Sequence, residues 1–415
     1  MYNRPKHSLR HVLLLALALL FFVSCSSDDP SEPTNRKTLL MYLPWSGDTY
    51  DLSSCFWQNV SDMKTAYDAL GDASVQVVVF ISTSSTKGVM FNINDYCGNN
   101  STALASYRQV SEHKLTTADG IATILSEMKS MAPANNYSLV IGCHGMGWLP
   151  TAKTSTTKRA RAAADAFVPY WQNDDPNNPT TRYFGGSSVE YQTDISTLVE
   201  GIERTGTKMD FILFDDCYMS TIEVAYDLRQ VADYVIACPT EVMSDGMPYA
   251  SIGRYLLGTP DYSAVCQRFV EHYSTDEFPF GTIGVAKCDE LDSLASIMRR
   301  VNSRDTSGVA NLGDIQRMDG YTPVIFFDYG DYVAHLCKDS TLLEEFNEQL
   351  ARAVPYKGYT EYFPTTLWPN GAISVSYTLR KIKVNAFSGI TTSEPSVNER
   401  VTSCYTSTAW YKATH

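Results

Sequence analysis

A histidine and a cysteine each follow an apolar run that predicts a buried strand. His144 follows residues 137–143, and Cys217 comes after residues 209–214. Functional groups collect beyond the carboxyl ends of parallel strands, so neighbouring strands would bring His144 and Cys217 together. A free thiol has a pKa of about 8.5, so an imidazole could take its proton and deliver it to a leaving amine. These residue types predict a cysteine nucleophile with a histidine general base.

Taken singly, each of these residues has an ordinary structural explanation. A cysteine after an apolar run is usually a small core residue. Cys143 is a rival nucleophile, but on a strand its side chain should point away from that of His144. Gly145 would let its backbone N–H approach a substrate carbonyl, and this N–H and that of Cys217 could hold an oxyanion.

Two short motifs carry a family resemblance. The sequences His-Gly-Met-Gly-Trp at residues 144–148 and Phe-Asp-Asp-Cys-Tyr-Met at residues 214–219 resemble the clostripain family of cysteine peptidases, which has a caspase-like fold. Further segments follow the family's order, at residues 38–48, 223–228, 232–241 and 246–249. The likeness covers roughly residues 37 to 380.

The resemblance implies a role for each matching residue. Cys217 would be the nucleophile, His144 the general base, and the amides of Gly145 and Cys217 the oxyanion hole. Asp215 matches the acid that lines the primary specificity pocket, where a carboxylate selects Arg or Lys before the cut. Alternatively, Asp215 caps a helix that begins near Cys217, and Asp216 competes for either role.

The chain departs from the family pattern at two positions. Asp216 stands where the family often has a small residue, and Met247 stands where it frequently has Trp. An acid pointing at the thiol would raise the thiol pKa, so we expect Asp216 to face away. The sequence therefore specifies the reaction type better than the substrate preference.

The N-terminus predicts export. A positively charged start precedes an apolar run of about 12 residues, 12–23, which is too short to span a bilayer and typical of a signal peptide. Phe-Val-Ser-Cys at residues 22–25 resembles a bacterial lipoprotein box, with Cys25 lipidated; ordinary signal cleavage is the alternative. Residues 1–24 would then be the signal peptide and residues 25–36 a polar tether. The acidic residues of this tether resemble a Bacteroidetes surface-export signal. The resemblance implies a lipid anchor in the cell envelope, at the outer membrane or the cell surface.

Composition indicates a sizeable globular body. The 415 residues are 44% hydrophobic, and we assign residues 37–385 to a peptidase domain and residues 386–415 to its C-terminal extension. The formal net charge of −13 argues against nucleic acid as a partner and mildly favours basic peptide substrates. The membrane would be reached through the lipid alone, and the oligomeric state stays open.

Cysteine spacing gives no sign of a metal centre. None of the ten cysteines forms a Cys-x-x-Cys pair, which disfavours zinc, and we expect mostly free, buried thiols. Clostripain-like enzymes sometimes depend on calcium, but no Asp-x-Asp-x-Asp-Gly loop occurs here. We therefore expect no metal and no other cofactor.

Alternating strand and helix patterns predict a three-layer α/β/α sandwich with a mostly parallel central sheet. We expect strands at residues 38–44, 74–81, 137–143, 209–214, 233–238, 281–287 and 372–377. We expect helices at residues 53–69, 117–131, 193–204, 219–231, 260–274, 289–303, 323–337 and 340–353. Residues 88–94 and 103–110 should form a short hairpin.

A long polar segment, residues 151–190, separates the two candidate catalytic strands. Loops of this length are usually functional or disordered, and members of the resembling family are often activated by a cut between the His and the Cys. We expect self-cleavage after one of four basic residues, Lys153, Lys158, Arg159 or Arg161. The alternative is a solvated loop that is never cut.

Two other functions compete with a peptidase that acts on peptides or proteins. The same fold could serve as a catalytically silent cell-surface lipoprotein that binds peptide or glycan, although a silent relative could lose His144 and Cys217, and this chain keeps both. A serine or aspartate hydrolase is disfavoured because no Gly-x-Ser-x-Gly turn occurs.

Overall fold

The computed structural model describes most of the chain from residue 35 onward. The described residues are 35–44, 52–111, 113–151, 185, 191–243, 245–275, 280–304, 308–365 and 380–415. The predicted signal peptide, Cys25 and the predicted strand at 372–377 lie outside them. Among the described residues, no helix has the length and apolar character needed to cross a membrane.

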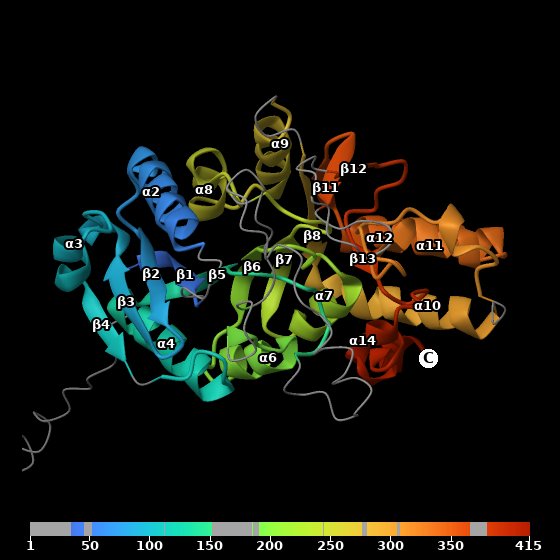
Figure 1. The fold of residues 1–415 in the computed structure, drawn as a ribbon, viewed down its shortest axis with the longest axis horizontal. Helices are drawn as coiled ribbons and strands as arrows, with labels where there is room; N and C mark the ends of the chain where they lie inside the picture. The colour runs from blue at the N-terminus through green and yellow to red at the C-terminus, as the bar shows by residue number, and fades with distance from the viewer. Residues whose placement is uncertain are drawn as a thin grey trace, which may run out of the picture. The chain divides into compact units, whose positions relative to one another are not determined.

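A nine-stranded sheet forms the middle layer, in the order β10-β8-β7-β6-β5-β1-β2-β3-β4 (Figure 1). Its strands are β1 (Asn35–Leu43), β2 (Val75–Ser84), β3 (Lys87–Asn92), β4 (Arg108–Ser111), β5 (Ala134–Gly142), β6 (Met209–Asp215), β7 (Ala232–Ala237), β8 (Thr282–Lys287) and β10 (Tyr356–Tyr359). The five strands from β7 to β2 run parallel, and each strand added at either edge is antiparallel to its inner neighbour. The sequences of these parallel strands are near-continuous apolar runs, because helices cover both faces of the sheet.

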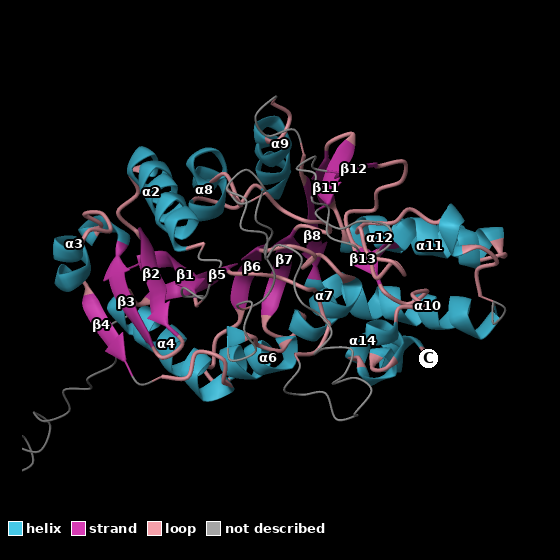
Figure 2. Ribbon diagram, in the orientation of Figure 1, coloured by secondary structure: helices cyan, strands magenta, loops and turns pink. Residues whose placement is uncertain are grey.

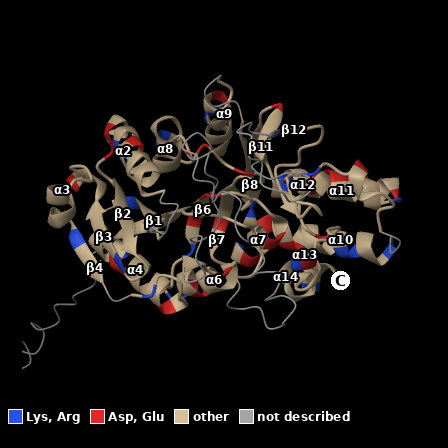
Figure 3. Ribbon diagram, in the orientation of Figure 1, with Lys and Arg blue, Asp and Glu red and all other residues tan. Residues whose placement is uncertain are grey.

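Helices cover both faces of the sheet. The helices are α2 (Ser53–Leu70), α3 (Ser101–Ser106), α4 (Ala118–Met131), α6 (Ile195–Glu203), α7 (Ile222–Leu228), α8 (Tyr249–Leu257), α9 (Tyr262–His272), α10 (Leu291–Arg304), α11 (Tyr329–Leu336), α12 (Ser340–Ala353), α13 (Glu399–Thr402) and α14 (Ala409–Thr414). Helices α2 and α8 lie on one side of the sheet, and α4 and α6 lie on the other (Figure 2). The predicted three-layer sandwich is confirmed. Acidic and basic residues are interspersed along the described helices (Figure 3), as is usual for solvated helix faces.

Helix α4 shows how the sequence pattern sets an element. The side chain of Thr117 accepts a hydrogen bond from the Gly120 N–H and caps the helix. The residues that the pattern predicted to face inward are buried: Ile121, Ile124, Leu125 and Met128.

Three predicted elements have wrong bounds, each because a side-chain cap sets a different start. Asn100 caps α3, so the first part of the predicted strand 103–110 is helical, although β3 and β4 still pair. Thr221 caps α7, so this helix begins at Ile222 and not at residue 219. Asp328 caps α11, and the predicted helix 323–337 shrinks to Tyr329–Leu336.

The sequence patterns missed helix α8. Its centre holds Gly253, a residue that lowers helix propensity. A Cβ atom at this position would lie 2.6 Å from the Cβ of Ala66 on α2. The glycine therefore lets the two helices pack closely, and this contact outweighs the lost propensity.

The C-terminal segment packs into the body of the protein. Strand β13 (Thr391–Thr392) pairs with β9 (Phe327–Asp328). The Thr391 N–H donates to the Ser220 carbonyl oxygen at 2.9 Å, just after the predicted nucleophile. Trp410 on α14 is fully buried and meets the rings of Tyr226 and Tyr329 edge-on.

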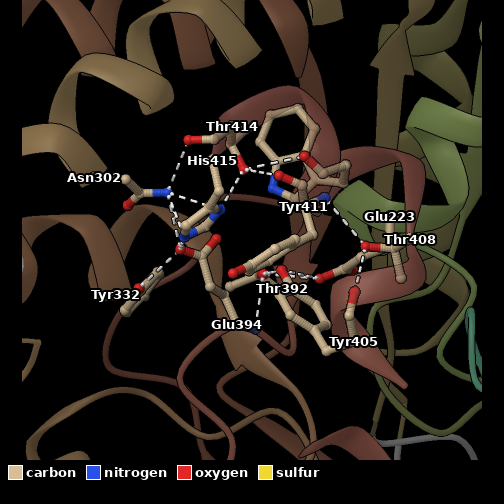
Figure 4. Close-up of polar contacts among 11 residues, drawn as sticks. Glu223, Asn302, Tyr332, Thr392, Glu394, Tyr405, Thr408, Tyr411, Thr414 and His415 are labelled. Atoms are coloured by element: carbon tan, nitrogen blue, oxygen red, sulfur yellow. Dashed lines mark hydrogen bonds and ion pairs between the residues drawn. The ribbon is translucent and has the colours of Figure 1, made fainter. Parts of the chain in front are cut away.

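Two glutamates with buried carboxyl groups, one on α7 and one within this segment, make hydrogen bonds here (Figure 4). Glu223 on α7 accepts hydrogen bonds from the Thr392 hydroxyl, the Ser393 N–H and the Tyr405 hydroxyl. Glu394 accepts hydrogen bonds from the Asn302 amide at 3.2 Å and the Tyr332 hydroxyl at 3.3 Å. Burial raises the pKa of both carboxyl groups, and the neighbouring Glu223 helps to raise that of Glu394 to about 7. The native fold therefore favours a proton on Glu394.

This raised pKa makes folding stability depend on pH. Between the ordinary value of 4.5 and the native value of about 7, native Glu394 holds a proton that the unfolded chain releases. The free energy of unfolding should therefore fall as pH rises through this window, by on the order of 3 kcal/mol, and the stabilisation should be complete below pH 4.5. Glu394→Gln imitates the protonated acid and should make this slope shallower, by removing the contribution of Glu394, in urea unfolding measured from pH 5 to 8.

The control is Glu348→Gln on α12, which removes an exposed carboxylate and should leave the slope unchanged. His415, 3.7 Å from Glu394, has a pKa lowered by burial and gives the opposite slope, but it is present in all three proteins. A Glu394→Gln slope equal to that of the wild type would contradict the prediction.

Candidate active site

The sheet brings the ends of β5 and β6 to the same edge. The two strands pair in parallel, and the register matches Leu139 with Ile212 and Gly142 with Asp215. His144 and Cys217 each lie two residues beyond the last of these pairs. The structure thus places the predicted base and the predicted nucleophile just beyond the ends of two adjacent parallel strands.

Backbone packing joins the two segments directly. A Cβ atom at Gly145 would lie 2.3 Å from the carbonyl oxygen of Cys217 and 2.8 Å from the Cβ of Asp216. Gly147 has a φ of +61°, and a Cβ there would lie 3.0 Å from the Tyr218 carbonyl oxygen, a tight contact but less severe than that at Gly145. The loop after β5 therefore rests on the turn after β6, and this contact requires glycine.

The two candidate catalytic side chains are buried. His144 is 0% and Cys217 is 1% exposed. The Val242 N–H donates a hydrogen bond to the Cys217 Sγ at 3.2 Å. The His144 N–H donates to the Gly185 carbonyl oxygen at 3.0 Å. Both residues are thus held from more than one segment of the chain.

Asp216 binds the end of β5. Its Oδ1 accepts a hydrogen bond from the Cys143 N–H at 2.6 Å, and its Oδ2 lies 3.6 Å from the Cys143 Sγ. A carboxylate at this distance opposes formation of a second negative charge. The contact therefore disfavours a thiolate on Cys143, the rival nucleophile.

Asp215 faces the loop that leads into α8. Its Oδ1 accepts a hydrogen bond from the Met247 N–H at 2.7 Å, and its Oδ2 accepts one from the Tyr249 hydroxyl at 3.1 Å. The cap of the following helix is Thr221, so the alternative that Asp215 or Asp216 caps that helix is wrong. Asp215 is instead a buried carboxylate two residues before the predicted nucleophile.

Tyr218, which the sequence analysis did not single out, fixes the turn after Cys217. Its φ of 59° places it in the left-handed region, which is uncommon for a residue with a side chain. Its ring stacks on Phe326 at 5.0 Å, and its hydroxyl donates to Glu241 at 2.7 Å. Such strain persists when surrounding contacts over-determine it, and no sequence pattern reveals it.

A second loop holds Phe326 in place. The buried Asp319 accepts hydrogen bonds from the backbone N–H groups of Tyr321 at 2.7 Å and Ile325 at 2.9 Å, and burial raises its pKa to about 7. The Tyr321 hydroxyl contacts the sulfur of Met146 at 3.2 Å. This loop thus reaches both the histidine loop and the cysteine turn.

The C-terminal segment also contacts both sides of the site. The Trp148 indole N–H donates to the Ser393 hydroxyl at 2.9 Å, and the Ser393 N–H donates to Glu223 at 2.9 Å. Trp148 belongs to the histidine loop, and Glu223 to the helix after the cysteine turn. Trp148 is part of the motif at residues 144–148, so one half of this link is visible in the sequence. Its partner, Ser393, could not be identified from the sequence.

Three further predictions concern the thiols, a possible metal site and the candidate processing residues. The nine described cysteines are free thiols, six of them buried, as predicted. Within the described ranges, no three His, Cys, Asp or Glu side chains gather as a metal site would need. The four candidate processing residues, Lys153, Lys158, Arg159 and Arg161, lie outside the described residues.

The contact at Gly145 predicts a large effect of one methyl group. Gly145→Ala would place its Cβ 2.3 Å from the Cys217 carbonyl oxygen, so it should lower the free energy of unfolding by roughly 3 kcal/mol. Gly206→Ala is the control: it meets nothing within 4 Å and strains only its φ of +65°, a cost of about 1 kcal/mol. Denaturant unfolding compares them, and equal losses would contradict the contact.

Comparison with known proteins identifies relatives of this chain. The model of the clostripain family matches residues 170–355. A solved structure described as a secreted C11 cysteine protease from Bacteroides thetaiotaomicron, iotapain, is 43% identical, with a TM-score of 0.74 over 92% of this chain and 99% of that one.

Two further solved structures are informative. A clostripain from Bacteroides thetaiotaomicron in complex with a peptide inhibitor is 51% identical over 56% of this chain and 99% of that one, with a TM-score of 0.50. An inactive zymogen C11 protease from Parabacteroides distasonis shares the fold at 24% identity, with a TM-score of 0.69 over 92% of this chain and 99% of that one. The search of curated proteins found no match. On its identity to iotapain over nearly the full length of both chains, the chain belongs to the clostripain family and is a cysteine peptidase.

Proposed function

We propose that this peptidase cleaves peptide bonds with Cys217 as nucleophile and His144 as general base. The observation that carries the proposal is the packing of Gly145 against the Cys217 carbonyl at the ends of two adjacent parallel strands. It fixes the histidine loop on the cysteine turn. Family membership favours this reading over a silent binding protein with the same fold.

The proposed reaction has two stages. His144 takes the proton of the Cys217 thiol, the sulfur attacks the peptide carbonyl carbon, and the N–H groups of Gly145 and Cys217 hold the oxyanion. His144 then gives its proton to the leaving amine, which leaves an acyl-enzyme. Water, deprotonated by His144, releases the acid and restores the thiol. No cofactor takes part in this scheme.

We further propose that Asp215 selects Arg or Lys at the residue before the cut. A buried carboxylate beside the nucleophile can form a charge-assisted hydrogen bond with a cationic side chain. The net charge of −13 favours the approach of basic peptides. The inhibitor bound to the 51% identical clostripain is BTN-VLTK-AOMK, whose peptide ends in Lys.

Paired reporter peptides test the nucleophile and the specificity together. Peptides that end in Arg or Lys should be cleaved, and peptides that end in Asp or Leu should not. Cys217→Ala and His144→Ala should lower kcat/KM by at least about 1,000-fold, because nucleophile and base act as a unit. Cys143→Ala is the matched control, since it removes the adjacent buried thiol and should keep most of the activity.

Each failure has a distinct meaning. Activity that survives Cys217→Ala and disappears in Cys143→Ala would transfer the nucleophile to Cys143. Cleavage after Leu or Asp would exclude Asp215 as a basic-side-chain pocket. No cleavage of any peptide, even after proteolytic nicking of residues 151–190, would favour the silent lipoprotein that binds peptide or glycan.

We also propose that the chain activates itself by cleavage between His144 and Cys217, after Lys153, Lys158, Arg159 or Arg161. The near-complete burial of both catalytic side chains means that a substrate needs a rearranged site. These basic residues would suit the proposed Arg or Lys specificity. A relative of the same fold is described as an inactive zymogen.

Intact mass measures this processing. The active wild type should consist of two fragments cut after one of the four basic residues, and Cys217→Ala should remain a single chain. A fully active protein with one unbroken chain would end the self-activation proposal without affecting the peptidase mechanism.

We propose that the protein is exported and anchored in the cell envelope through a lipid on Cys25. The apolar run at 12–23 and the lipoprotein box at 22–25 support this location. The 43% identical relative is described as secreted.

A further inference from the structure

A short segment after β7, residues 238–242, runs beside the nucleophile turn. The Ser220 N–H donates to the Cys238 carbonyl oxygen at 3.1 Å, and the Tyr218 N–H donates to the Thr240 carbonyl oxygen at 3.1 Å. In return, the Val242 N–H donates to the Cys217 sulfur at 3.2 Å. The proposed mechanism uses none of these contacts, yet one of them reaches the reacting atom.

Glu241 lies between the last two contacts and is 2% exposed. Its Oε1 accepts hydrogen bonds from the Tyr218 hydroxyl at 2.7 Å and the Thr365 hydroxyl at 2.8 Å. Thr365 ends strand β11 (Tyr362–Thr365), far along the chain from both other residues. Glu241 therefore joins three segments behind the nucleophile.

Burial of the Glu241 carboxylate at this position is unfavourable in free energy unless it is compensated. Burying a charged group costs several kcal/mol unless donors compensate it, so an apolar residue would fill the space at a lower cost. Two hydroxyl donors from different segments make the position of Glu241 specific. The residue that follows it, Val242, consequently has a fixed backbone, and its N–H points at the Cys217 sulfur.

The direction of this N–H matters because the thiolate is the reactive form. A donor hydrogen bond stabilises a negative sulfur more than a neutral thiol, and so lowers the pKa of the thiol. A shift of one pKa unit changes the thiolate fraction about tenfold at a pH below the pKa. The hydrogen bond from Val242 thus bears on the rate of nucleophilic attack.

We propose that Glu241 is a positioning residue that holds the Val242 N–H on the Cys217 sulfur and thereby favours the thiolate. The proposal rests on the proposed role of Cys217 as nucleophile. It assigns Glu241 no contact with the substrate. Its negative charge by itself acts in the opposite direction, because a carboxylate near the sulfur disfavours the thiolate.

The position of Glu241 and its charge should change the pKa of the Cys217 thiol in opposite directions, so variants can separate the two effects. The full chain is alkylated with iodoacetamide across a pH range under the conditions of the reporter assay, and peptide mass mapping follows Cys217 among the other thiols. Glu241→Ala removes the acceptor and should raise the pKa of the Cys217 thiol by about one unit. It should also lower kcat about tenfold at neutral pH and leave KM for the basic reporter within about twofold.

Glu241→Gln is the rescue variant. Its amide oxygen can still accept both hydroxyl groups and the charge is gone, so the thiol pKa should stay at or slightly below the wild-type value and kcat should stay close to wild type. Glu241→Asp keeps the charge but cannot reach both donors, so it should resemble Glu241→Ala; it also serves as the test if the alanine variant does not fold.

Two results would overturn the proposal. An unchanged thiol pKa in folded Glu241→Ala or Glu241→Asp would mean a purely structural role, whatever happens to kcat. An equal rise in Glu241→Gln, which keeps the acceptor and removes a charge that by itself raises the thiol pKa, would mean that the hydrogen bonds to Glu241 do not set the thiol pKa. A wild type that cleaves no reporter, but whose Cys217 thiol pKa shifts as expected in the variants, would sink the peptidase mechanism and leave the role of Glu241 intact.

Discussion

The close approach of Gly145 to the Cys217 carbonyl is the constraint on which the site depends. A distance of 2.3 Å from a would-be Cβ leaves no room for any side chain. The parallel register of β5 and β6 sets the heights of the two segments, and the glycine lets them touch. A one-residue slip in that register would turn every side chain of β6 to the other face of the sheet. Sheet pairing and loop packing therefore fix the same geometry, and neither alone would do so.

Buried carboxylates fasten the loops around this contact. Asp215 binds the loop before α8, Asp216 binds the end of β5, Asp319 shapes the loop that carries Phe326, and Glu241 binds Tyr218. Each accepts hydrogen bonds from backbone N–H or hydroxyl groups, which offsets the cost of taking a charge out of water. Apolar packing would be cheaper but less specific, because it leaves a loop free to shift. Here the donors determine where each loop must lie.

The sequence predicts what is local and periodic. Apolar runs locate the five parallel strands, and the residues after two of them locate His144 and Cys217. The left-handed Tyr218 and the contacts of Glu241 and Ser393 could not be predicted, because each depends on partners distant in sequence. Trp148 and Ser393 are 245 residues apart. Helix α8 was missed because Gly253 weakens its local signal, while its contact with α2 is invisible in the sequence.

The arrangement also explains how a cut in residues 151–190 could leave strands β5 and β6 paired. Strands β5 and β6 stay paired without their covalent connection, because the ladder from Leu139 to Gly142 holds the register. The histidine loop has further anchors in the Cys217 turn, in Tyr321 and in Ser393, none of which lies in residues 151–190. The entropy cost of closing a loop grows only slowly with loop length. Losing the covalent connection therefore changes the stability less than the several buried contacts that remain. A fold with these anchors can lose the connection between His144 and Cys217 and still hold the two residues together.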